Sequence, residues 1–586
     1  MLRFLKSVLK SILVTLISFT IIVLAFIAIA VSSGMEEDKK TKKNTLLEIN
    51  LSEKIVDRSS DFSFDLGALS DEPTALGLDD ILIAIEKAKY DDNIKGIYLN
   101  IDVVNSSMAS LEEVRDKLQE FKDSTDKFIL AYSEMYSQKA YYISSIADKV
   151  YLHPEGFLEF KGLSYEGMFF KEALEKLEVE PQIIRHGKFK SAVEPFILDK
   201  MSESNRKQVK RFISSIWEDM KTDIASGRDL PEDELNTIAE GLLVQSAKDA
   251  LDYKLADALQ YEDQIEDTLR KKIGIKEDKE IEKISLKAYS QIGVSSKKKK
   301  FSKDKIAVIF AQGAINSGEG DNESIGSVTT SNAIKKARKD DKIKAIVLRV
   351  NSPGGSALAS ETILREMELA KAVKPVVVSM GDVAASGGYY IACKADTIVA
   401  NPTTITGSIG VFGVLMNFEK MMKNKLGITT DRVKTNAFAD LASPTRPLTQ
   451  EERAIIQNQV ERVYDKFITH VAEGRNMSKE EVDSIGQGRV WTGKDALELG
   501  LVDVMGGMED AITIAADMAE LESYRITKLP IEKNPIEKII EDLEGQVKNR
   551  IIKNEIGHGY TYYKQLNELV SMEKLQMRMP IQFEIY

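Results

Sequence analysis

One serine in this chain has neighbours that would suit a catalytic nucleophile. Ser386 lies in V-V-V-S-M-G-D-V-A-A-S-G-G-Y-Y, residues 376–390, directly before Gly387 and Gly388. The small neighbours would let a substrate backbone approach the hydroxyl, and the glycines permit unusual main-chain angles where a helix begins. The same letters also fit an ordinary glycine-rich turn between a buried strand and a helix, so the motif alone leaves both interpretations open.

A lysine is the candidate partner of this serine. A serine hydroxyl needs a nearby base to take its proton, and a lysine can be that base when burial lowers its pKa. Lys190 lies in H-G-K-F-K-S-A-V-E-P-F, residues 186–196, where Phe189 and the residues after it could desolvate the amine. Lys188 is the alternative, and either lysine could instead be exposed.

An internal repeat relates the two candidates. Residues 91–97 match residues 340–346 at an offset of 249, and the Y-Y-I of 141–143 matches that of 389–391 at an offset of 248. Two later matches keep the same order: 226–228 with 473–475, and 248–251 with 494–497. Because single-residue shifts are what loop insertions produce, the chain is predicted to be a tandem duplication.

The two halves differ at the positions that could do chemistry. At an offset of 248, Ser386 falls on Gln138, and Lys190 falls on Phe438. The first half therefore lacks the serine, and the second lacks the lysine. This is the pattern expected of a Ser/Lys site divided between the halves, which the fold must bring face to face.

Both repeats show strands alternating with helices, which predicts parallel α/β units. In the second repeat we expect strands at 306–310, 343–350, 375–379 and 397–400, and helices at 331–339, at 360–371 and from Gly387 onward. The amphipathic stretch 449–474 predicts a long packing helix. The charged segment 270–305 is interpreted as a solvated linker between the repeats.

Composition narrows the class of protein. The chain has 586 residues and a net charge of −12, which argues against a nucleic-acid binder and predicts more than one large domain. Its single cysteine, Cys393, excludes an internal disulfide and leaves too little sulfur for a zinc cluster. The four histidines have no metal-ligand spacing and no phosphate-binding loop is present. We expect neither a metal nor a cofactor.

The N-terminus predicts a membrane anchor. Residues 12–31 are uncharged and mostly apolar, about the length of a membrane-spanning helix. Arg3, Lys6 and Lys10 precede this stretch, so the N-terminus should be cytoplasmic and the rest of the chain should lie across the membrane. A cleaved signal peptide is the alternative, because residues 28–30 read A-I-A, but the apolar run is longer than usual for such a segment.

Four motifs resemble one protein family. They are F-K-S-A-V-E-P-F at 189–196, R-V-N-S-P-G-G-S at 349–356, G-D-V-A-A-S-G-G-Y-Y at 381–390 and G-S-I-G-V-F at 407–412. In this order they resemble the long form of signal peptide peptidase A, a membrane-anchored Ser/Lys protease of peptidase family S49. The resemblance extends from the anchor to about Leu521.

The resemblance implies a role for each site residue. Ser386 would be the nucleophile, Lys190 the general base, and Ser408 the residue that orients the lysine amine. The turn that contains Gly354 and Gly355 would hold the oxyanion through main-chain N–H groups, with Gly354 the better candidate. The turn could also be an ordinary connection between a strand and a helix.

The resemblance also implies an architecture. It predicts an α/β tandem of Clp-protease/crotonase-like β-β-α spiral domains after one transmembrane helix. The expected divisions are an anchor and stalk at 1–45, repeats at 46–300 and 301–525, and a C-terminal extension at 526–586. Family members look like tetrameric domes with interior active sites, so a homotetramer is expected. The extension could be a subunit contact or a mobile end.

The implied task is degradation of hydrophobic peptides, chiefly cleaved signal peptides. The enzyme would sit in the bacterial inner membrane through its N-terminal helix, with its catalytic domains on the periplasmic side. Two alternatives remain open from the sequence: an acyl-CoA lyase or hydratase of the crotonase kind, and an inactive envelope scaffold. The scaffold would be supported if Ser386 and Lys190 lay too far apart to interact.

Overall fold

The computed structural model describes residues 41–59, 75–292, 302–321, 323–531 and 575–579, and five isolated positions between 10 and 18. The predicted anchor, residues 12–31, falls almost entirely outside the described residues. Within the part of the chain that the structure describes, no helix is both long enough and apolar enough to span a bilayer.

The first half of the chain builds one parallel sheet, in the order β8-β6-β5-β4-β1-β9. Its strands are β1 (Thr45–Ile49), β4 (Ile94–Asn100), β5 (Phe128–Tyr136), β6 (Lys149–Leu158), β8 (Ala258–Leu259) and β9 (Lys283–Ser285). Helices on this sheet include α2 (Leu78–Tyr90), α3 (Met108–Ser124) and α4 (Gln138–Ser144). The prediction of parallel α/β units is confirmed for this half.

The interpretation of residues 270–305 as a solvated linker is wrong for the segment's centre. β9 pairs with β1, and α11 (Leu286–Gln291) packs against α2. Tyr289 of α11 is fully buried, and Lys87 donates a hydrogen bond to its carbonyl oxygen over 2.9 Å. A few apolar residues among many charges are therefore enough to fix this segment to the first sheet.

The second half builds the second sheet, in the order β19-β17-β15-β13-β10-β21, with β16 beside β15 and β20 beside β16. Its strands are β10 (Lys305–Gln312), β13 (Ile343–Ser352), β15 (Val376–Ala385), β16 (Thr397–Ala400), β17 (Ile405–Gly407), β19 (Val490–Thr492), β20 (Val504–Met505) and β21 (Arg525–Leu529). The helices of this half include α12 (Ser327–Lys339), α13 (Ala357–Lys371) and α14 (Gly387–Ala392). Every strand and helix predicted for this repeat is present.

Strand β15 is longer than the sequence predicts. It pairs first with β16 over residues 377–380 and then with β17 over residues 383–385. This change of partner carries the strand past the predicted end at 379 and up to Ser386. The nucleophile candidate therefore lies directly at the end of a central strand.

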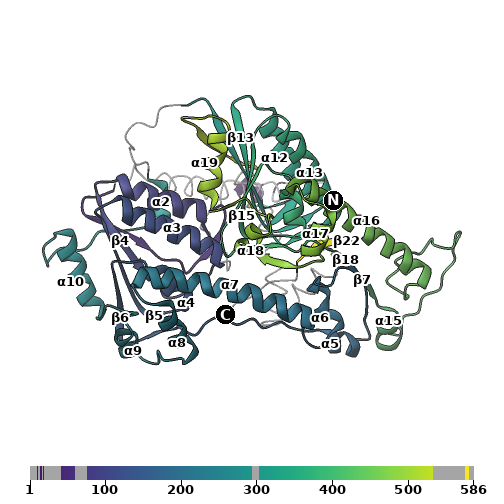
Figure 1. The fold of residues 1–586 in the computed structure, drawn as a ribbon, viewed down its shortest axis with the longest axis horizontal. Helices are drawn as coiled ribbons and strands as arrows, with labels where there is room; N and C mark the ends of the chain where they lie inside the picture. Colours follow the sequence, from purple (N-terminus) through teal and green to yellow (C-terminus); the bar gives the residue numbers. More distant parts are fainter. Residues whose placement is uncertain are drawn as a thin grey trace.

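Each half also contains a 26-residue helix at the same place in the repeat. These are α7 (Glu203–Arg228) and α16 (Gln450–Arg475), and each ends at a residue in the left-handed conformation, Asp229 or Asn476. The long helix predicted at 449–474 is thus confirmed. In Figure 1, α7 crosses the lower part of the molecule, and α16 extends toward the right edge.

A third sheet combines strands from both halves, in the order β12-β11-β14-β22-β18-β7. Its strands are β7 (Glu180–His186), β11 (Ala314–Asn316), β12 (Ser324–Gly326), β14 (Gly354–Ser356), β18 (Val411–Asn417) and β22 (Leu575–Arg578). β7 of the first half pairs antiparallel with the whole length of β18 of the second. β7, β18 and β22 lie together right of centre in Figure 1.

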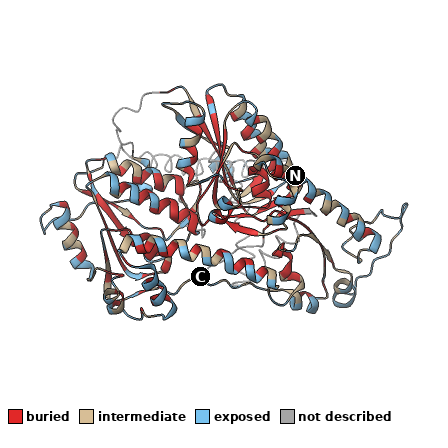
Figure 2. Cartoon of the chain, in the orientation of Figure 1, coloured by how far each residue is buried: buried red, intermediate tan, exposed pale blue. Residues whose placement is uncertain are grey.

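A buried arginine joins the first half to the central strand β13. The side chain of Arg349 is fully buried, and its Nε donates to Oδ1 of Asp57 over 2.8 Å. Its Nη2 lies 2.7 Å from Oε1 of Glu113, and Nη1 donates to Oγ of Ser379 over 2.8 Å. Both carboxylates come from the first half. Figure 2 shows that the strands around this region are largely buried.

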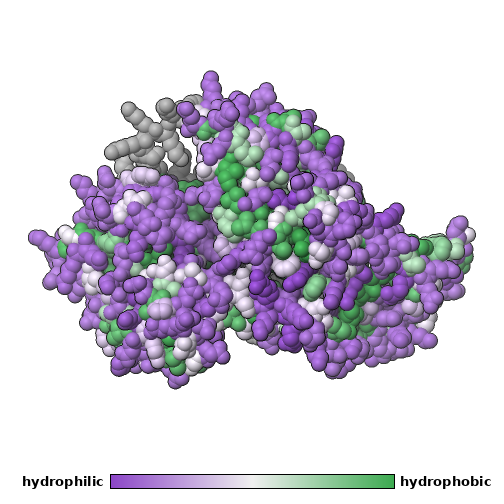
Figure 3. Space-filling view, in the orientation of Figure 1, coloured by the Kyte–Doolittle hydropathy of each residue, from purple (hydrophilic) through white to green (hydrophobic). Residues whose placement is uncertain are grey.

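The segment between α15 (Glu419–Leu426) and α16 carries exposed apolar side chains at one end of the molecule. Val433 is 99% exposed, and Ile428 and Phe438 are also exposed. Figure 3 shows apolar side chains gathered at this right-hand end, on a face that is otherwise mostly hydrophilic. Phe438, the repeat counterpart of Lys190, thus lies on the surface.

Candidate active site

Ser386 occupies a strained turn between β15 and α14. Its main-chain angles are φ 56° and ψ −112°, a conformation that residues other than glycine rarely adopt. The turn is held by its own amide, which donates to the carbonyl oxygen of Gly407 over 2.8 Å. Such strain persists where the surrounding structure fixes the backbone, and it is typical of strand-to-helix turns that present a nucleophile.

The two glycines after Ser386 are required by close packing. A Cβ atom on Gly387 would lie 2.8 Å from Oγ of Ser360 and 3.0 Å from the main-chain nitrogen of Gly355. A Cβ atom on Gly388 would lie 2.7 Å from the carbonyl oxygen of Ser352. The glycine motif therefore lets the start of α14 pack directly against the turn at β14.

The structure brings together three of the predicted site residues. Nζ of Lys190 lies 2.8 Å from Oγ of Ser386. The same Nζ lies 3.0 Å from Oγ of Ser408 and 3.1 Å from the Ser408 carbonyl oxygen. All three side chains are fully buried. The lysine amine therefore has hydrogen-bond partners in both serines at once.

Burial lowers the basicity of Lys190. Burial lowers the pKa of its amine well below the usual 10.5, and no other cause contributes. Among the described residues, no carboxylate forms an ion pair with this lysine, and the centroid of the Phe412 ring lies 5.9 Å from Nζ. Burial therefore favours the neutral form of the amine. Lys188, the alternative candidate, is exposed.

Two glycines, Gly488 and Gly410, lie directly against Lys190. A Cβ atom on Gly488 would lie 2.7 Å from the main-chain nitrogen, Cα and Cβ of Lys190, and Gly488 has a φ of +82°. A Cβ atom on Gly410 would lie 3.3 Å from Cδ of Lys190. The main chain at Gly488 and Gly410 therefore packs directly against Lys190 because these positions lack side chains.

Polar residues of the first half hold the segment that carries Lys190. Lys190 is followed by η1 (Ser191–Val193) and α6 (Glu194–Ile197). The buried carboxylate of Glu194 accepts hydrogen bonds from the Ser202 hydroxyl over 2.6 Å and from the Asn205 amide over 3.0 Å. Both partners stand at the N-terminus of α7, so the long helix fixes the position of the lysine.

Gln208 of α7 joins this segment to the second sheet. Its side-chain nitrogen donates to the Phe189 carbonyl over 3.2 Å and to Oγ of Ser191 over 3.0 Å, and its side-chain oxygen accepts from the Val490 amide over 3.3 Å. Sequence reasoning missed Glu194 and Gln208 as supports of the site. Only Glu194 stood inside a recognised motif, which could have signalled its role.

The glycine turn at β14 lies next to the serine. Gly354 has a φ of +96°, and a Cβ atom there would lie 2.6 Å from the main-chain nitrogen of Gly387. The Gly354 amide donates to Oγ of Ser352 over 3.1 Å. The Gly355 nitrogen lies 3.0 Å from where a Cβ atom on Gly387 would stand. The turn at Gly354 and Gly355 therefore packs closely against Gly387. Gly387 was not among the sequence candidates for this role.

The corresponding position in the first half has a structural role. Gln138 begins α4, and its side-chain oxygen accepts hydrogen bonds from the amides of Lys161 and Gly162, both over 3.0 Å. Its side-chain nitrogen donates to the Gly162 carbonyl oxygen over 3.1 Å. Gln138 thus fixes the loop at residues 161–162, whereas Ser386, at the equivalent position of the second half, contacts Lys190.

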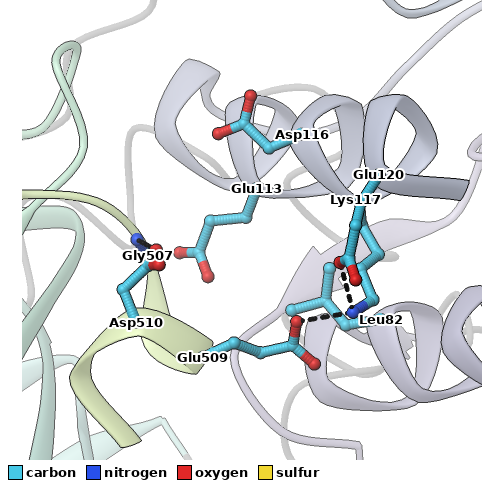
Figure 4. Close-up of a pocket in the computed structure, with 8 residues that line it drawn as sticks. All are labelled: Leu82, Glu113, Asp116, Lys117, Glu120, Gly507, Glu509 and Asp510. Atoms are coloured by element: carbon cyan, nitrogen blue, oxygen red, sulfur yellow. Dashed lines mark hydrogen bonds and ion pairs between the residues drawn. The ribbon is translucent and has the colours of Figure 1, made fainter. Parts of the chain in front are cut away.

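A separate polar pocket lies between α3 and α19 (Met508–Met518), at the seam of the two halves (Figure 4). Lys117 lies 2.8 Å from Glu120 and 2.9 Å from Glu509, and burial raises the pKa of Asp116 to about 6. None of the predicted site residues lines this pocket. No group of acidic, histidine or cysteine side chains in the described part of the chain is arranged to hold a metal ion.

Comparison with known proteins decides the family. Peptidase family S49 matches residues 120–276 and 368–522, one segment in each half. "Protease 4" of Salmonella typhi is 38% identical over 547 residues, which cover 90% of this chain and 87% of that protein. The chain belongs to peptidase family S49. This confirms the resemblance inferred from the four motifs.

Two further relatives agree with this S49 assignment. "Protease 4" of Haemophilus influenzae is 35% identical and covers 86% of this chain and 84% of its own. "Serine protease SPPA, chloroplastic" of Arabidopsis thaliana is 33% identical and covers 84% of this chain and 72% of its own. The chain is therefore a serine protease, which overturns the alternative of an acyl-CoA lyase.

The S49 segments also fit the mixed α/β tandem seen in the fold. Lys190 lies in the first matched segment, and Ser386 and Ser408 lie in the second. The two segments are thus not equivalent in what they contribute to the site. Each holds part of a cluster that forms only when the two halves pack together.

Proposed function

We propose that Ser386 and Lys190 form the catalytic dyad of this S49 protease. The observation that carries the proposal is the 2.8 Å separation of Nζ and Oγ in a fully buried setting. A neutral amine at this distance can accept the serine proton as Oγ attacks a peptide carbonyl. An inactive scaffold would have been favoured if the two side chains lay too far apart to interact, and at 2.8 Å they do not.

Proton transfer through Lys190 accounts for both acylation of Ser386 and the later hydrolysis of the acyl-serine. Oγ of Ser386 forms a bond to the carbonyl carbon, while its proton passes to Nζ of Lys190. The ammonium then returns a proton to the departing amine as the C–N bond breaks and an acyl-serine remains. Water, deprotonated by the same amine, hydrolyses the ester. Ser408 accepts two N–H groups of the lysine and so directs its lone pair toward Ser386.

The oxyanion would be held by main-chain N–H groups of Gly355 and Gly387. In support, a Cβ atom on Gly387 would lie 3.0 Å from the Gly355 nitrogen, and Gly387 directly follows the nucleophile. Gly354 would shape the turn because its own amide is engaged by Ser352. Such donors are typically worth about 3 kcal/mol of transition-state stabilisation each.

The substrates we propose are hydrophobic peptides such as cleaved signal peptides. In support, the chain is similar over most of its length to proteins named Protease 4, and residues 12–31 of its sequence are uncharged and mostly apolar. On this proposal the enzyme is envelope-associated, with a single N-terminal anchor in the bacterial inner membrane and its catalytic halves on the periplasmic side. We further propose that each half has the Clp-protease/crotonase-like spiral fold and that the protein assembles as a homotetramer. The domain boundaries given in the sequence analysis stay predictions.

Cleavage of a fluorogenic hydrophobic peptide tests this function. Wild type should cleave the peptide, whereas Ser386→Ala and Lys190→Met should lose at least about 10²-fold in kcat, the usual worth of a general base. Lys188→Met is the matched control because Lys188 is exposed and two residues away. It should retain wild-type activity. Full activity in Ser386→Ala would overturn the proposal.

A further inference from the structure

Strand β15 contains a bulge shortly before the candidate nucleophile. Between two successive pairs of its ladder with β13, the chain of β13 spans residues 350–352, whereas the chain of β15 spans residues 380–384. The additional residues of β15 therefore lie within the segment 381–383, and Ser386 follows the end of the strand. Bulges are frequent next to active sites, where they redirect a side chain. The conformation of this bulge thus bears on where the Ser386 hydroxyl points.

The side chain of Asn351, on β13, contacts all three residues of the bulge. Its Oδ1 accepts a hydrogen bond from the Val383 amide over 3.2 Å, and its Nδ2 donates to Oδ2 of Asp382 over 3.3 Å. A Cβ atom on Gly381 would lie 3.1 Å from Cγ of Asn351, so the glycine leaves room for this amide group. The bulge is therefore held by one side chain that accepts with its oxygen and donates with its nitrogen.

Asp382 joins the bulge to the first half of the chain. Its Oδ1 accepts a hydrogen bond from the Ser110 amide over 2.9 Å, and its Oδ2 accepts one from the Ser110 hydroxyl over 2.9 Å. Ser110 lies in the first turn of α3, which packs against β15 (Figure 1). Ser107, the N-cap residue of α3, makes no side-chain cap bond. The carboxylate of the second half thus supplies an acceptor that the N-terminus of this helix needs.

The hydrogen bonds of Asp382 require a carboxylate at this position. Three donors meet its two oxygens: the Ser110 amide, the Ser110 hydroxyl and Nδ2 of Asn351. An asparagine would turn an amide nitrogen toward one of these donors. If Asn351 rotated its own amide to compensate, it would lose the hydrogen bond from Val383. The pair of Asp382 and Asn351 therefore works as a unit, with one residue dependent on the other.

We propose that Asp382 is a positioning residue for Ser386. Through Asn351 it fixes the bulge of β15, and through Ser110 it sets that bulge against the half of the chain that supplies Lys190. The proposal rests on the proposed function, since it takes Ser386 as the nucleophile. Asp382 makes its contact between the halves four residues before that serine, so its loss displaces the hydroxyl from the lysine amine. A displaced hydroxyl slows the chemical step more than it weakens peptide binding, so kcat should fall while KM changes little.

Exchange of the two side chains tests this role. In Asp382→Asn the new amide faces Nδ2 of Asn351, and kcat on a fluorogenic peptide should fall at least about tenfold, because position governs the rate. Asn351→Asp alone places two carboxylates side by side and should also lower kcat. In the double variant the carboxylate at position 351 accepts from the Val383 amide and from the amide at position 382. Its kcat should return to within about threefold of wild type, as expected of a coupled pair.

Asp396→Asn is the matched control for a loss of strand stability alone. The Asp396 carboxylate accepts a hydrogen bond from the Val376 amide over 2.9 Å, at the start of the same strand and far along it from Ser386. This variant should keep the wild-type kcat even where its thermal midpoint falls. An equal loss of kcat in Asp396→Asn and Asp382→Asn would overturn the positioning role. A double variant no more active than the two single variants would overturn it as well.

The rate at which a fluorophosphonate labels Ser386 separates this proposal from the assignment of the nucleophile. Labelling of Asp382→Asn at least about tenfold more slowly than wild type supports the positioning role, because the hydroxyl has moved from its base. Equal rates in these two proteins would reject the positioning role and leave the nucleophile in place. Absence of an adduct on Ser386 in wild type would reject the nucleophile, and the positioning role with it.

Discussion

Nζ of Lys190 and Oγ of Ser386 lie 2.8 Å apart although 196 positions separate the two residues in the chain. The contact depends on the pairing of β7 with β18, which carries the segment after β7 across to the second half. Gln208 then ties that segment to Val490. The separation of two catalytic atoms is thus set by packing between the halves of a duplicated chain.

Ser408→Ala should lower kcat more than it changes KM. The Ser408 hydroxyl lies 3.0 Å from Nζ of Lys190, so its loss leaves the amine less well directed toward Ser386. We expect kcat to fall by about 10-fold or more, since general-base catalysis depends on position. Steady-state kinetics on a fluorogenic peptide provide the measurement.

Thr406→Ala is the control for the Ser408 variant. Thr406 lies in β17, two residues before Ser408, and is equally buried, but its hydroxyl donates to the Ala384 carbonyl over 2.8 Å and does not contact the lysine. It should therefore have a smaller effect on kcat. If the two variants lose kcat equally, Ser408 acts on the loop rather than on the lysine.

The pH dependence of kcat/KM should reflect a lysine with a low pKa. Only the neutral amine accepts the serine proton, so activity should rise with pH as Lys190 loses its proton. Burial lowers that pKa well below 10.5, and the rise should therefore be complete well below pH 10. The residual activity of Lys190→Met should lack this rise. A rise centred near the ordinary lysine pKa would show that the amine is solvated.

Gly488→Ala should inactivate the enzyme without unfolding it. The new Cβ atom would lie 2.7 Å from main-chain atoms of Lys190 and would push the lysine from Ser386. A shift of about 1 Å at a reacting group can cost about 10²-fold in rate. Peptide cleavage and circular dichroism should be measured on the same preparation.

Gly427→Ala is matched to this variant in backbone strain. Gly427 has a φ of +68° against +82° for Gly488, but a Cβ atom there would meet nothing within 4 Å. Both substitutions place alanine in the left-handed region, and only one crowds the lysine. Comparable activity losses in the two variants would point to strain and not to displacement of Lys190.

Arg349→Met should destabilise the contact between the halves. Removal of the guanidinium leaves the carboxylates of Asp57 and Glu113 buried without their cation. Breaking a buried ion pair in this way typically costs about 3–5 kcal/mol. The thermal midpoint should fall clearly, whereas Arg365→Met, which removes an exposed ion pair with Glu368, should leave it nearly unchanged. An unchanged midpoint for Arg349→Met would contradict a bridging role.

The sequence was informative about the site because motifs and repeats can be read directly from the order of residues, without knowledge of contacts between distant segments. The offset between halves predicted that Ser386 and Lys190 come from different copies, and alternating apolar runs predicted the strands of the second sheet. Ser408 was found only through its motif. The exposure of Lys188 shows why the choice between neighbouring lysines needed the fold.

The remaining features depend on contacts between distant segments. Nothing local in Asp57 or Glu113 indicates that both pair with Arg349, and nothing in β9 reveals that it joins β1. The strand at 575–578 lies in the C-terminal extension, for which the sequence left a subunit contact or a mobile end open. Its alternation of apolar and polar residues, L-Q-M-R, was the signal that could have predicted a strand.

The most direct test of the dyad is the site of covalent labelling by a fluorophosphonate, mapped by peptide mass spectrometry. The account predicts one adduct on Ser386 in wild type, none in Ser386→Ala, and a strongly reduced labelling rate in Lys190→Met, because the hydroxyl then has no base. Lys188→Met should be labelled as wild type is. An adduct on another serine, or undiminished labelling of Ser386→Ala, would contradict the assignment.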